Sequence, residues 1–242
     1  MSLVVVRRAD SPADIRCAFA IRAAAFSQLG GNRHTPFDTR PDTRSFLATT
    51  PRGDGVAAGW VVSGRSGSLP SAGIFAQMGW PLNPPGFAHW DEFTRFGTSP
   101  QYQRTRTGLA GFLGMAGAAV CHGLKPEAPR LHWLMTMMPG LVQSLDWVPY
   151  EGLHRGPFQY RGGPNTLEPI WAATVYLPEV PRALQLVRPR LYTLMFPGGV
   201  PSGEWPAGRS DDDLRELIAA NRAILATHIS QAGERSLPVY TA

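Results

Sequence analysis

Strand-like runs alternate with helical segments along the first 177 residues, and this alternation is the feature that most restricts the fold. Short β-branched and aromatic runs are typical of strands, whereas longer apolar or small-residue segments are typical of helices. The predicted strands are residues 3–6, 55–63, 90–96, 131–138 and 169–177, and the predicted helices are residues 12–26, 108–124 and 140–147. This order predicts an α/β or α+β fold with a central mixed sheet flanked by helices. Residues 33–51 are polar and interrupted by proline, so a loop or an irregular helix is expected there.

Two helices carry start signals. Ser11 suits an N-cap, Pro12 suits the first helical position, and Asp14 lies near the positive end of the helix dipole. Ser210 precedes three aspartates and then a set of apolar residues at helical spacing, which comprises Leu214, Leu217, Ile218 and Leu225. Because the composition changes after residue 177, we predict a core over residues 1–178 and a C-terminal extension over residues 179–242. The amphipathic helix of this extension is expected to pack on the core or on a partner subunit.

The composition excludes several classes of protein. With 43% hydrophobic and 17% charged residues, the 242-residue chain can supply a folded core. No run reaches the roughly 18 apolar residues of a membrane span, and at the N-terminus the charges follow the apolar stretch, unlike a secretory signal. A cytoplasmic location is therefore expected.

Two cysteines without a CxxC pair predict neither a disulfide framework nor a metal site. The basic residues that give the net charge of +5 are scattered, so no nucleic-acid partner is expected.

Residues 90–96 combine charged and aromatic side chains in strict alternation. A regular strand would direct Glu92, Thr94 and Phe96 to one face and Phe93 and Arg95 to the other. Charged groups inside an apolar strand are unfavourable unless they are paired or functional. The pattern therefore indicates either an exposed edge strand with solvated charges or a carboxylate in a substrate cleft, with Arg95 binding a substrate carboxylate or fixing the opposite loop.

The segment that follows is typical of an anion site. Arg104 and Arg106 lie just before a helix that is rich in small residues, and Gly108 lies at its start. Backbone N–H groups at a helix N-terminus, with arginines beside them, suit a pyrophosphate or a phosphopantetheine phosphate. An arginine-bearing loop before such a helix is also common on ordinary solvated surfaces.

The order of these elements resembles that of the GNAT acyltransferases. In their Arg/Gln-x-x-Gly-x-Gly/Ala loop motif, Gly108 and Ala110 match, while Thr105 stands at the first position. Within this superfamily the sequence is most similar to the acyl-homoserine-lactone synthases, which make quorum-sensing autoinducers. Their Glu-x-Ser/Thr-Arg-Phe strand is matched at every position, by the residues Glu92, Thr94, Arg95 and Phe96.

Other parts of the same family pattern are also present. Its Arg-x-x-x-Phe helix is matched by Arg22 and Phe26, and its acidic loop by Phe37 and Asp38. A later strand with a hydroxyl residue is matched at Thr136. The chain departs from the family at a tryptophan, a second aspartate and an arginine that shape the S-adenosylmethionine site. These departures leave open a different amine substrate.

The resemblance implies transfer of an acyl group from acyl carrier protein or acyl-CoA to the amine of S-adenosylmethionine, followed by lactonisation. It implies Glu92 as the base, acting directly or through water, and Asp38 as the group that orients the amine. Arg22 and Arg95 would bind the carboxylate end or lock an N-terminal lid. Phe26 would help to close the pocket, and Phe96 would also be a substrate-binding residue.

Two further roles follow from the resemblance. Thr136 would hydrogen-bond a substituted acyl chain, and a set of loop residues would bind the donor phosphate or an acidic carrier, namely Arg104, Arg106 and Gly108. It implies no tightly bound cofactor. Two alternatives stay open, an N-acyltransferase that uses another amine such as a free amino acid, and a non-catalytic acyl-binding protein. The oligomeric state is not readable from the sequence.

Overall fold

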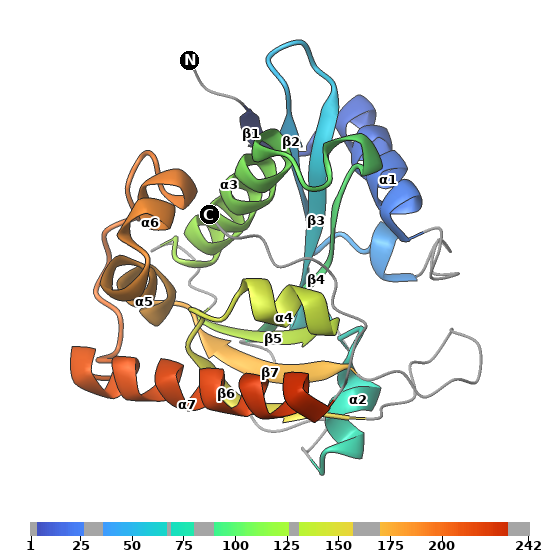
Figure 1. The fold of residues 1–242 in the computed structure, drawn as a ribbon. Coiled ribbons are helices and arrows are strands. Elements are labelled where there is room, and N and C mark those ends of the chain that lie inside the picture. The colour runs from blue at the N-terminus through green and yellow to red at the C-terminus, as the bar shows by residue number, and fades with distance from the viewer. Residues whose placement is uncertain are drawn as a thin grey trace.

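A seven-stranded mixed sheet forms the centre of the molecule (Figure 1). The computed structural model describes residues 4–26, 36–66, 69–79, 90–125, 131–156 and 170–231. The strands are β1 (Val5–Arg8), β2 (Thr43–Thr49), β3 (Gly55–Ser63), β4 (Trp90–Thr98), β5 (His132–Met137), β6 (Tyr150–Arg155) and β7 (Trp171–Tyr176). Their order across the sheet is β1-β2-β3-β4-β5-β7-β6, and among these strands β4 and β5 alone pair in parallel.

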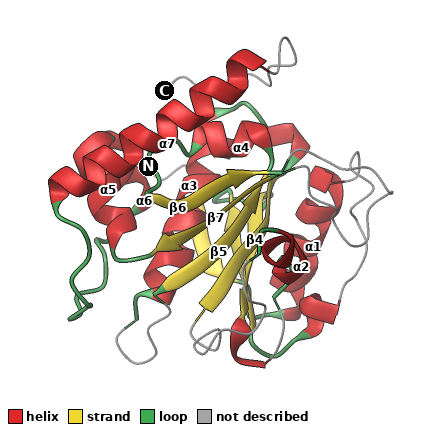
Figure 2. Cartoon of the chain, turned by 90° about the horizontal axis from the view of Figure 1, so that it is seen from below, coloured by secondary structure: helices red, strands yellow, loops and turns green. Residues whose placement is uncertain are grey.

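Helices cover both faces of this sheet (Figure 2). One face carries α1 (Pro12–Phe26) and α2 (Ala72–Gln77), which pack on two separate apolar clusters. The other face carries α3 (Arg106–Gly123), α4 (Pro139–Ser144), α5 (Glu179–Val187), α6 (Pro189–Met195) and α7 (Asp211–Gln231), which share the largest cluster. The fold class predicted from the sequence, a mixed sheet flanked by helices, is thus confirmed.

The loop predicted over residues 33–51 is wrong, because β2 lies within it. This strand is hydrogen-bonded to β1 on one side and to β3 on the other. Its first half is polar and half-buried, and only its last four residues are fully buried, so the sequence shows little of the usual strand pattern. Its place between two strands, which is a tertiary effect, decides its structure. The elements α2, β6, α5 and α6 were also not predicted from the sequence.

Both predicted helix starts are confirmed. The Ser11 hydroxyl accepts a hydrogen bond from the backbone N–H of Asp14 at 3.1 Å, and α1 begins at Pro12. At the start of α7, Ser210 accepts from the backbone N–H of Asp213, whose carboxylate accepts in return from the Ser210 backbone. This reciprocal arrangement pairs two backbone donors at the helix end.

The C-terminal helices pack on the rest of the molecule. Leu214, Ile218 and Leu225 of α7 are buried, and the Asn221 side chain donates to the Tyr150 carbonyl on β6 at 3.0 Å. This amphipathic helix thus contacts the sheet of its own chain. Within the described residues, no helix is long and apolar enough to cross a membrane.

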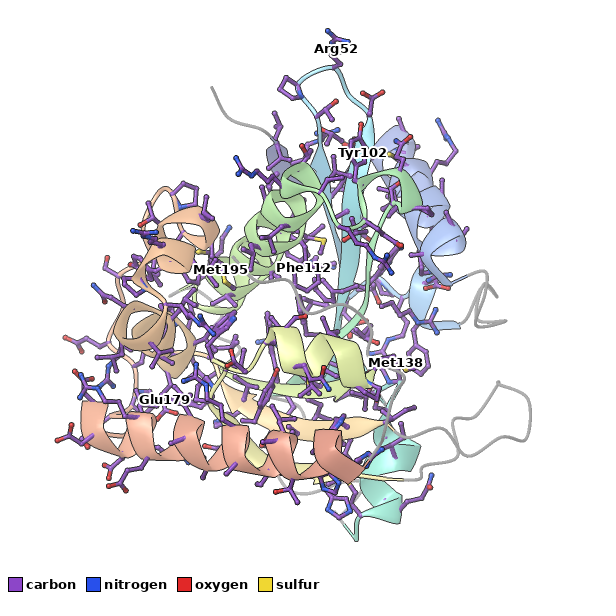
Figure 3. The ribbon with its side chains drawn as sticks, viewed as in Figure 1. Arg52, Tyr102, Phe112, Met138, Glu179 and Met195 are labelled. Atoms are coloured by element: carbon purple, nitrogen blue, oxygen red, sulfur yellow. The ribbon has the colours of Figure 1, made fainter. Side chains whose placement is uncertain are left out.

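The α3 and α6 backbones touch closely. A Cβ atom at Gly117 of α3 would lie 1.9 Å from the carbonyl oxygen of Met195, which ends α6 (Figure 3). No side chain larger than a hydrogen atom fits there without a shift of one backbone. This contact ties the C-terminal segment to the helix that follows β4.

The parallel pair β4–β5 opens into a fork. Hydrogen-bonded pairing begins at Trp90 with His132 and ends at Phe93 with Met135. Beyond that point, Thr94, Gly97 and Thr98 of β4 pair with β3 alone, and residues 136–137 of β5 pair with β7 alone. The two strands therefore separate toward their carboxyl ends, which leaves backbone groups facing the gap without a strand partner.

Candidate active site

A β-bulge in β4 sets the direction of its side chains. The pairing with β3 shifts register between Ala58 and Trp60, and Arg95 adopts a left-handed conformation with φ of 58°. The extra residue interrupts the alternation. Phe96 consequently packs with Phe93 on the α3 face, while Arg95 lies on the α1 face. The predictions that Phe96 shares a face with Glu92 and that Arg95 shares a face with Phe93 are therefore wrong.

Glu92 is fully enclosed. Its side chain is 0% exposed, on a central strand between apolar neighbours that include Val62 of β3 and Leu134 of β5. This excludes the exposed edge strand that the sequence left open. Burial raises the pKa of Glu92 to about 7, although hydrogen bonds from Ser71 and Thr94 and the charge of Arg95 act in the opposite direction. A carboxylate with a pKa near neutrality is suited to act as a general base.

Ser71 binds both oxygens of this carboxylate. Its backbone N–H donates to Oε2 of Glu92 and its hydroxyl donates to Oε1, each at 2.7 Å. The same Ser71 hydroxyl lies 2.9 Å from Oγ1 of Thr136, at hydrogen-bond distance. Sequence reasoning missed Ser71, because a serine in a turn 21 positions before the acid gives no sign of this contact. The structure thus joins Glu92 to the predicted substrate-binding residue Thr136 through one side chain.

A buried ion cluster lies beside Glu92. Arg22 of α1 binds both carboxylate oxygens of Asp38, which lies in a short 3-10 helix (Pro36–Thr39), and Arg95 approaches the same carboxylate at 3.4 Å. The side chains of Arg22 and Asp38 are each 2% exposed. Among the described residues, two guanidinium groups thus surround the Asp38 carboxylate, and Arg95 also interacts with Glu92. Asp38 is therefore already paired.

The Arg22 guanidinium also contacts two aromatic rings. It lies 4.6 Å from the ring centre of Phe19 and 5.0 Å from that of Trp60, and these two rings meet edge to face. Such cation–π contacts help to compensate a desolvated charge. Arg22 is consequently held rigidly in place, which in turn fixes the position of Asp38.

The opposite face of the fork is apolar. Phe93 stacks on Trp133 with ring centres 4.6 Å apart, and Met135 and Met137 of β5 are buried in the same cluster. Phe112 of α3 lies on this side (Figure 3). The two faces of the fork thus differ sharply, with carboxylate and hydroxyl groups on the α1–α2 face and an apolar surface on the α3 face.

The arginine loop lies at the far end of β4. Arg104, with φ of 60°, and Arg106 are exposed, and Thr105 caps α3 by accepting from the backbone N–H of Gly108 at 3.0 Å. A Cβ atom at Gly108 would lie 1.9 Å from the carbonyl oxygen of Tyr102, so this glycine permits a close backbone contact (Figure 3). The N–H of Gly108 is thus occupied by the cap, whereas the two arginines face solvent.

The structure groups the predicted site residues into separate sets. Glu92, Thr136, Arg95, Arg22 and Asp38 come together on one face of the fork. Arg104, Arg106 and Gly108 lie beyond the open end of β4, and Phe96 lies on the opposite face of the fork. The side chain of Phe26, at the end of α1, is outside the described residues. Among the described residues, no group of acidic, cysteine or histidine side chains could hold a metal ion.

Comparison with known proteins supports the fold. No protein-family model matches the sequence, and no curated protein matches it. Among solved structures, FeeM, an N-acyl amino acid synthase from uncultured soil microbes, is similar with a TM-score of 0.57 at 15% identity, over 74% of this chain and 93% of that chain. The acyl-homoserine-lactone synthase LasI is similar with a TM-score of 0.54 at 13% identity, over 85% of this chain and 100% of that chain.

A third similar structure is TofI, solved in a ternary complex with an inhibitor and MTA. Its TM-score is 0.52 at 16% identity, over 78% of this chain and 100% of that chain. At these identities the similarity establishes the fold and no activity. The chain therefore has a GNAT-like fold, the architecture of the acyltransferase structures that it matches.

Proposed function

We propose that the protein is an N-acyltransferase that moves a fatty acyl group from an acyl carrier protein or acyl-CoA thioester to the α-amine of a small acceptor that bears a carboxylate. The observation that carries this proposal is the buried Glu92 carboxylate, with its pKa near 7, beside the fork between β4 and β5. Attack on a thioester requires a deprotonated amine, and a base with a pKa near the working pH provides it efficiently.

The remaining groups have consistent roles. The thioester would lie in the fork, where unpaired backbone N–H groups of β4 could polarise its carbonyl oxygen. The apolar surface around Trp133 and Met135 would take the acyl chain. Arg104 and Arg106, at the exposed end of the loop, would attract the phosphate or the acidic carrier. Arg95, which at 17% exposure has the most exposed side chain of the ion cluster, would bind the acceptor carboxylate.

Two acceptors are supported by different observations. S-adenosylmethionine, with lactonisation and release of methylthioadenosine, is supported by the Glu-x-Thr-Arg-Phe match and by the similarity to LasI. A free amino acid is supported by the ion cluster, because Asp38 is already bound by two arginines and its carboxylate is occupied rather than available to a sulfonium cation. The similarity to FeeM, an N-acyl amino acid synthase, points the same way. The geometry thus favours the amino acid.

Product mass spectrometry tests the proposal. The protein is incubated with acyl-carrier and acyl-CoA donors of several lengths, with S-adenosylmethionine or with each free amino acid. We expect an acyl-amino acid with release of the free thiol, and a lactone with methylthioadenosine would identify S-adenosylmethionine instead. Glu92→Gln serves as the inactive control, with a loss of turnover of about 10² or more. Acyl-thioester binding without any product would refute the proposal and indicate a non-catalytic acyl-binding protein.

A further inference from the structure

Enclosure of Glu92 raises a problem for its proposed role as a base. The carboxylate is 0% exposed and both of its oxygens are bound by Ser71, so an amine in the fork has no direct path to it. A base must reach the proton that it removes directly or through intermediate groups. The Thr94 hydroxyl also bonds to Glu92 but is itself buried, whereas the hydroxyls of Ser71 and Thr136 form a continuous chain from the carboxylate to a partly exposed residue.

Thr136 occupies the right place for the outer end of this chain. The last hydrogen-bonded pair between β4 and β5 is Phe93 with Met135, so Thr136 is the first residue of β5 beyond the closed part of the fork. It is partly exposed, whereas Ser71 and Glu92 are buried. The chain of hydroxyls therefore runs from the opening of the fork inward to the carboxylate.

Ser71 makes an unusual use of its hydroxyl. It stands at the N-cap position of α2, where a serine side chain ordinarily accepts a hydrogen bond from the first turn of the helix. Here its side chain makes no cap bond, and the first-turn N–H groups of Ile74 and Phe75 bond instead to its backbone carbonyl. The hydroxyl is directed to Glu92 and Thr136. The Ser71 hydroxyl therefore links Glu92 and Thr136 and does not cap the helix.

The hydrogen bonds that join Thr136, Ser71 and Glu92 can run in either of two opposite directions. When Glu92 is ionised, Ser71 must donate to it, so Thr136 donates to Ser71 and its own oxygen is left to accept a proton from the fork. When Glu92 is protonated, every bond can reverse, and Thr136 then donates outward. A chain of this kind carries a proton in one direction and is reset by the opposite transfer.

We propose that Thr136 and Ser71 relay the proton of the attacking amine to Glu92, an inference that rests on the proposed acyl transfer. As the amine nitrogen bonds to the thioester carbonyl carbon, its N–H proton moves to Oγ1 of Thr136. The Thr136 proton moves to Oγ of Ser71, and the Ser71 proton moves to Oε1 of Glu92. The amine loses one proton, the carboxylate gains one, and both hydroxyls are unchanged. The bond between the carbonyl carbon and sulfur then breaks, and return of the proton along the same hydroxyls to the departing thiolate gives the free thiol and the ionised carboxylate.

Paired variants test the relay. Ser71→Ala and Thr136→Val each remove one hydroxyl, and we expect each to lower kcat about 10²-fold with an unsubstituted acyl donor while KM changes less than about twofold. Ser71→Thr and Thr136→Ser keep a hydroxyl, so their kcat should stay within about tenfold of wild type. Ser144→Ala on α4, which removes a hydroxyl that bonds to a carbonyl on its own helix, is the matched control and should leave kcat unchanged.

The outcomes separate the relay from other roles of the same residues. If a hydroxyl-free variant keeps at least half of the wild-type kcat, the relay is overturned. A loss in Thr136→Val that is confined to 3-oxo or 3-hydroxy donors would also overturn it, and would show that Thr136 recognises the acyl chain instead. Loss of rescue in both conservative variants would indicate a packing role.

A titration of Glu92 provides a readout that does not depend on turnover. The carboxyl group, labelled with ¹³C and followed by NMR, should titrate at higher pH in Ser71→Ala, because a hydrogen bond that favours the ionised form is lost. A smaller change in the same direction is expected in Thr136→Val, since Thr136 supports the Ser71 hydroxyl. The charged groups nearest to Glu92, Arg95 with its partners Asp38 and Arg22, are intact in both variants.

An unchanged titration in Thr136→Val would mean that the three groups are not coupled, which overturns the relay even if acyl transfer is confirmed. Conversely, wild-type protein without any acylated product refutes the proposed function, and the titration still decides whether the chain of hydroxyls acts as one unit. The two failures are therefore distinguishable.

Discussion

Replacing Glu92 with glutamine should change how the stability of the protein depends on pH. The fold holds the pKa of Glu92 at about 7, whereas the ordinary value, which we assign to the unfolded chain, is 4.5. Between these values the unfolded chain has released the proton and the folded protein still binds it. The unfolded state then binds fewer protons, so the free energy of unfolding falls as the pH rises. The contribution of Glu92 to stability is complete below pH 4.5 and is lost as the pH rises through about 7.

The size of the effect follows from the two pKa values. Their difference corresponds to about 3 kcal/mol, most of which falls between pH 5 and pH 8.5. Glutamine resembles the protonated acid in shape and does not titrate, so Glu92→Gln lacks this dependence. We therefore expect the stability of the variant relative to wild type to increase by about 2–3 kcal/mol from pH 5 to pH 8.5.

Urea denaturation of both proteins, followed by tryptophan fluorescence at several pH values, measures this difference directly. The contributions of all other titrating groups cancel in the comparison. Glu216→Gln, at an exposed position on α7, is the control and should show no pH-dependent difference from wild type. A constant difference between Glu92→Gln and wild type would refute the reasoning, because it would mean that Glu92 titrates in the folded protein as it does in water.

Three other changes have defined outcomes. Replacing both Arg104 and Arg106 with alanine should raise KM for a carrier-bound donor more than for a small thioester, and high salt should have the same effect on wild type. Asp38→Asn should lower the free energy of unfolding by about 3–5 kcal/mol in urea denaturation, because it leaves a buried guanidinium without its counter-charge. Gly117→Ala should lower it by about 1–3 kcal/mol, since the added methyl group meets the Met195 carbonyl.

Two of these changes have a control variant within the chain. Asp10→Asn breaks the exposed ion pair with Arg8 and should alter stability by less than about 1 kcal/mol. Gly114→Ala in the same helix meets a single side-chain atom of Val6 and should be better tolerated than the change at position 117. Equal KM effects on both donors would assign Arg104 and Arg106 to the phosphate itself, and no effect would leave them as solvated surface.

Local patterns in the sequence predicted the elements that are strongly periodic or clearly capped. The strand over residues 55–63 is observed with the same bounds, and α1 and α7 begin where Ser11 and Ser210 indicated. β2 was missed because its pairing with two neighbouring strands, rather than its own residues, determines its structure. The short C-terminal helices α5 and α6 were missed, although the buried residues of α5, which include Val180, Ala183 and Leu184, follow a helical period.

The site was predictable as a set of residues but not as a network. Arg22, Asp38, Glu92 and Arg95 were singled out from a family pattern, yet their contacts depend on how distant segments meet. The bulge at Arg95 could not be foreseen, because a left-handed backbone at a non-glycine residue has no local sequence signal. The bulge places Arg95 and Phe96 each on the face opposite to the one expected. Ser71 was missed for a similar reason, since its partners lie 21 and 65 positions away.

The fork has a mechanical consequence for the whole molecule. Four residue pairs between β4 and β5 are the only strand contacts that hold the β1–β4 half of the described sheet to the β5–β7 half. The C-terminal helices span this seam, because α6 presses on α3, which follows β4, while α7 packs on β6. We therefore expect residues 179–231, the part of the described chain that follows every strand, to limit movement between the two halves of the sheet and with it the width of the opening between β4 and β5.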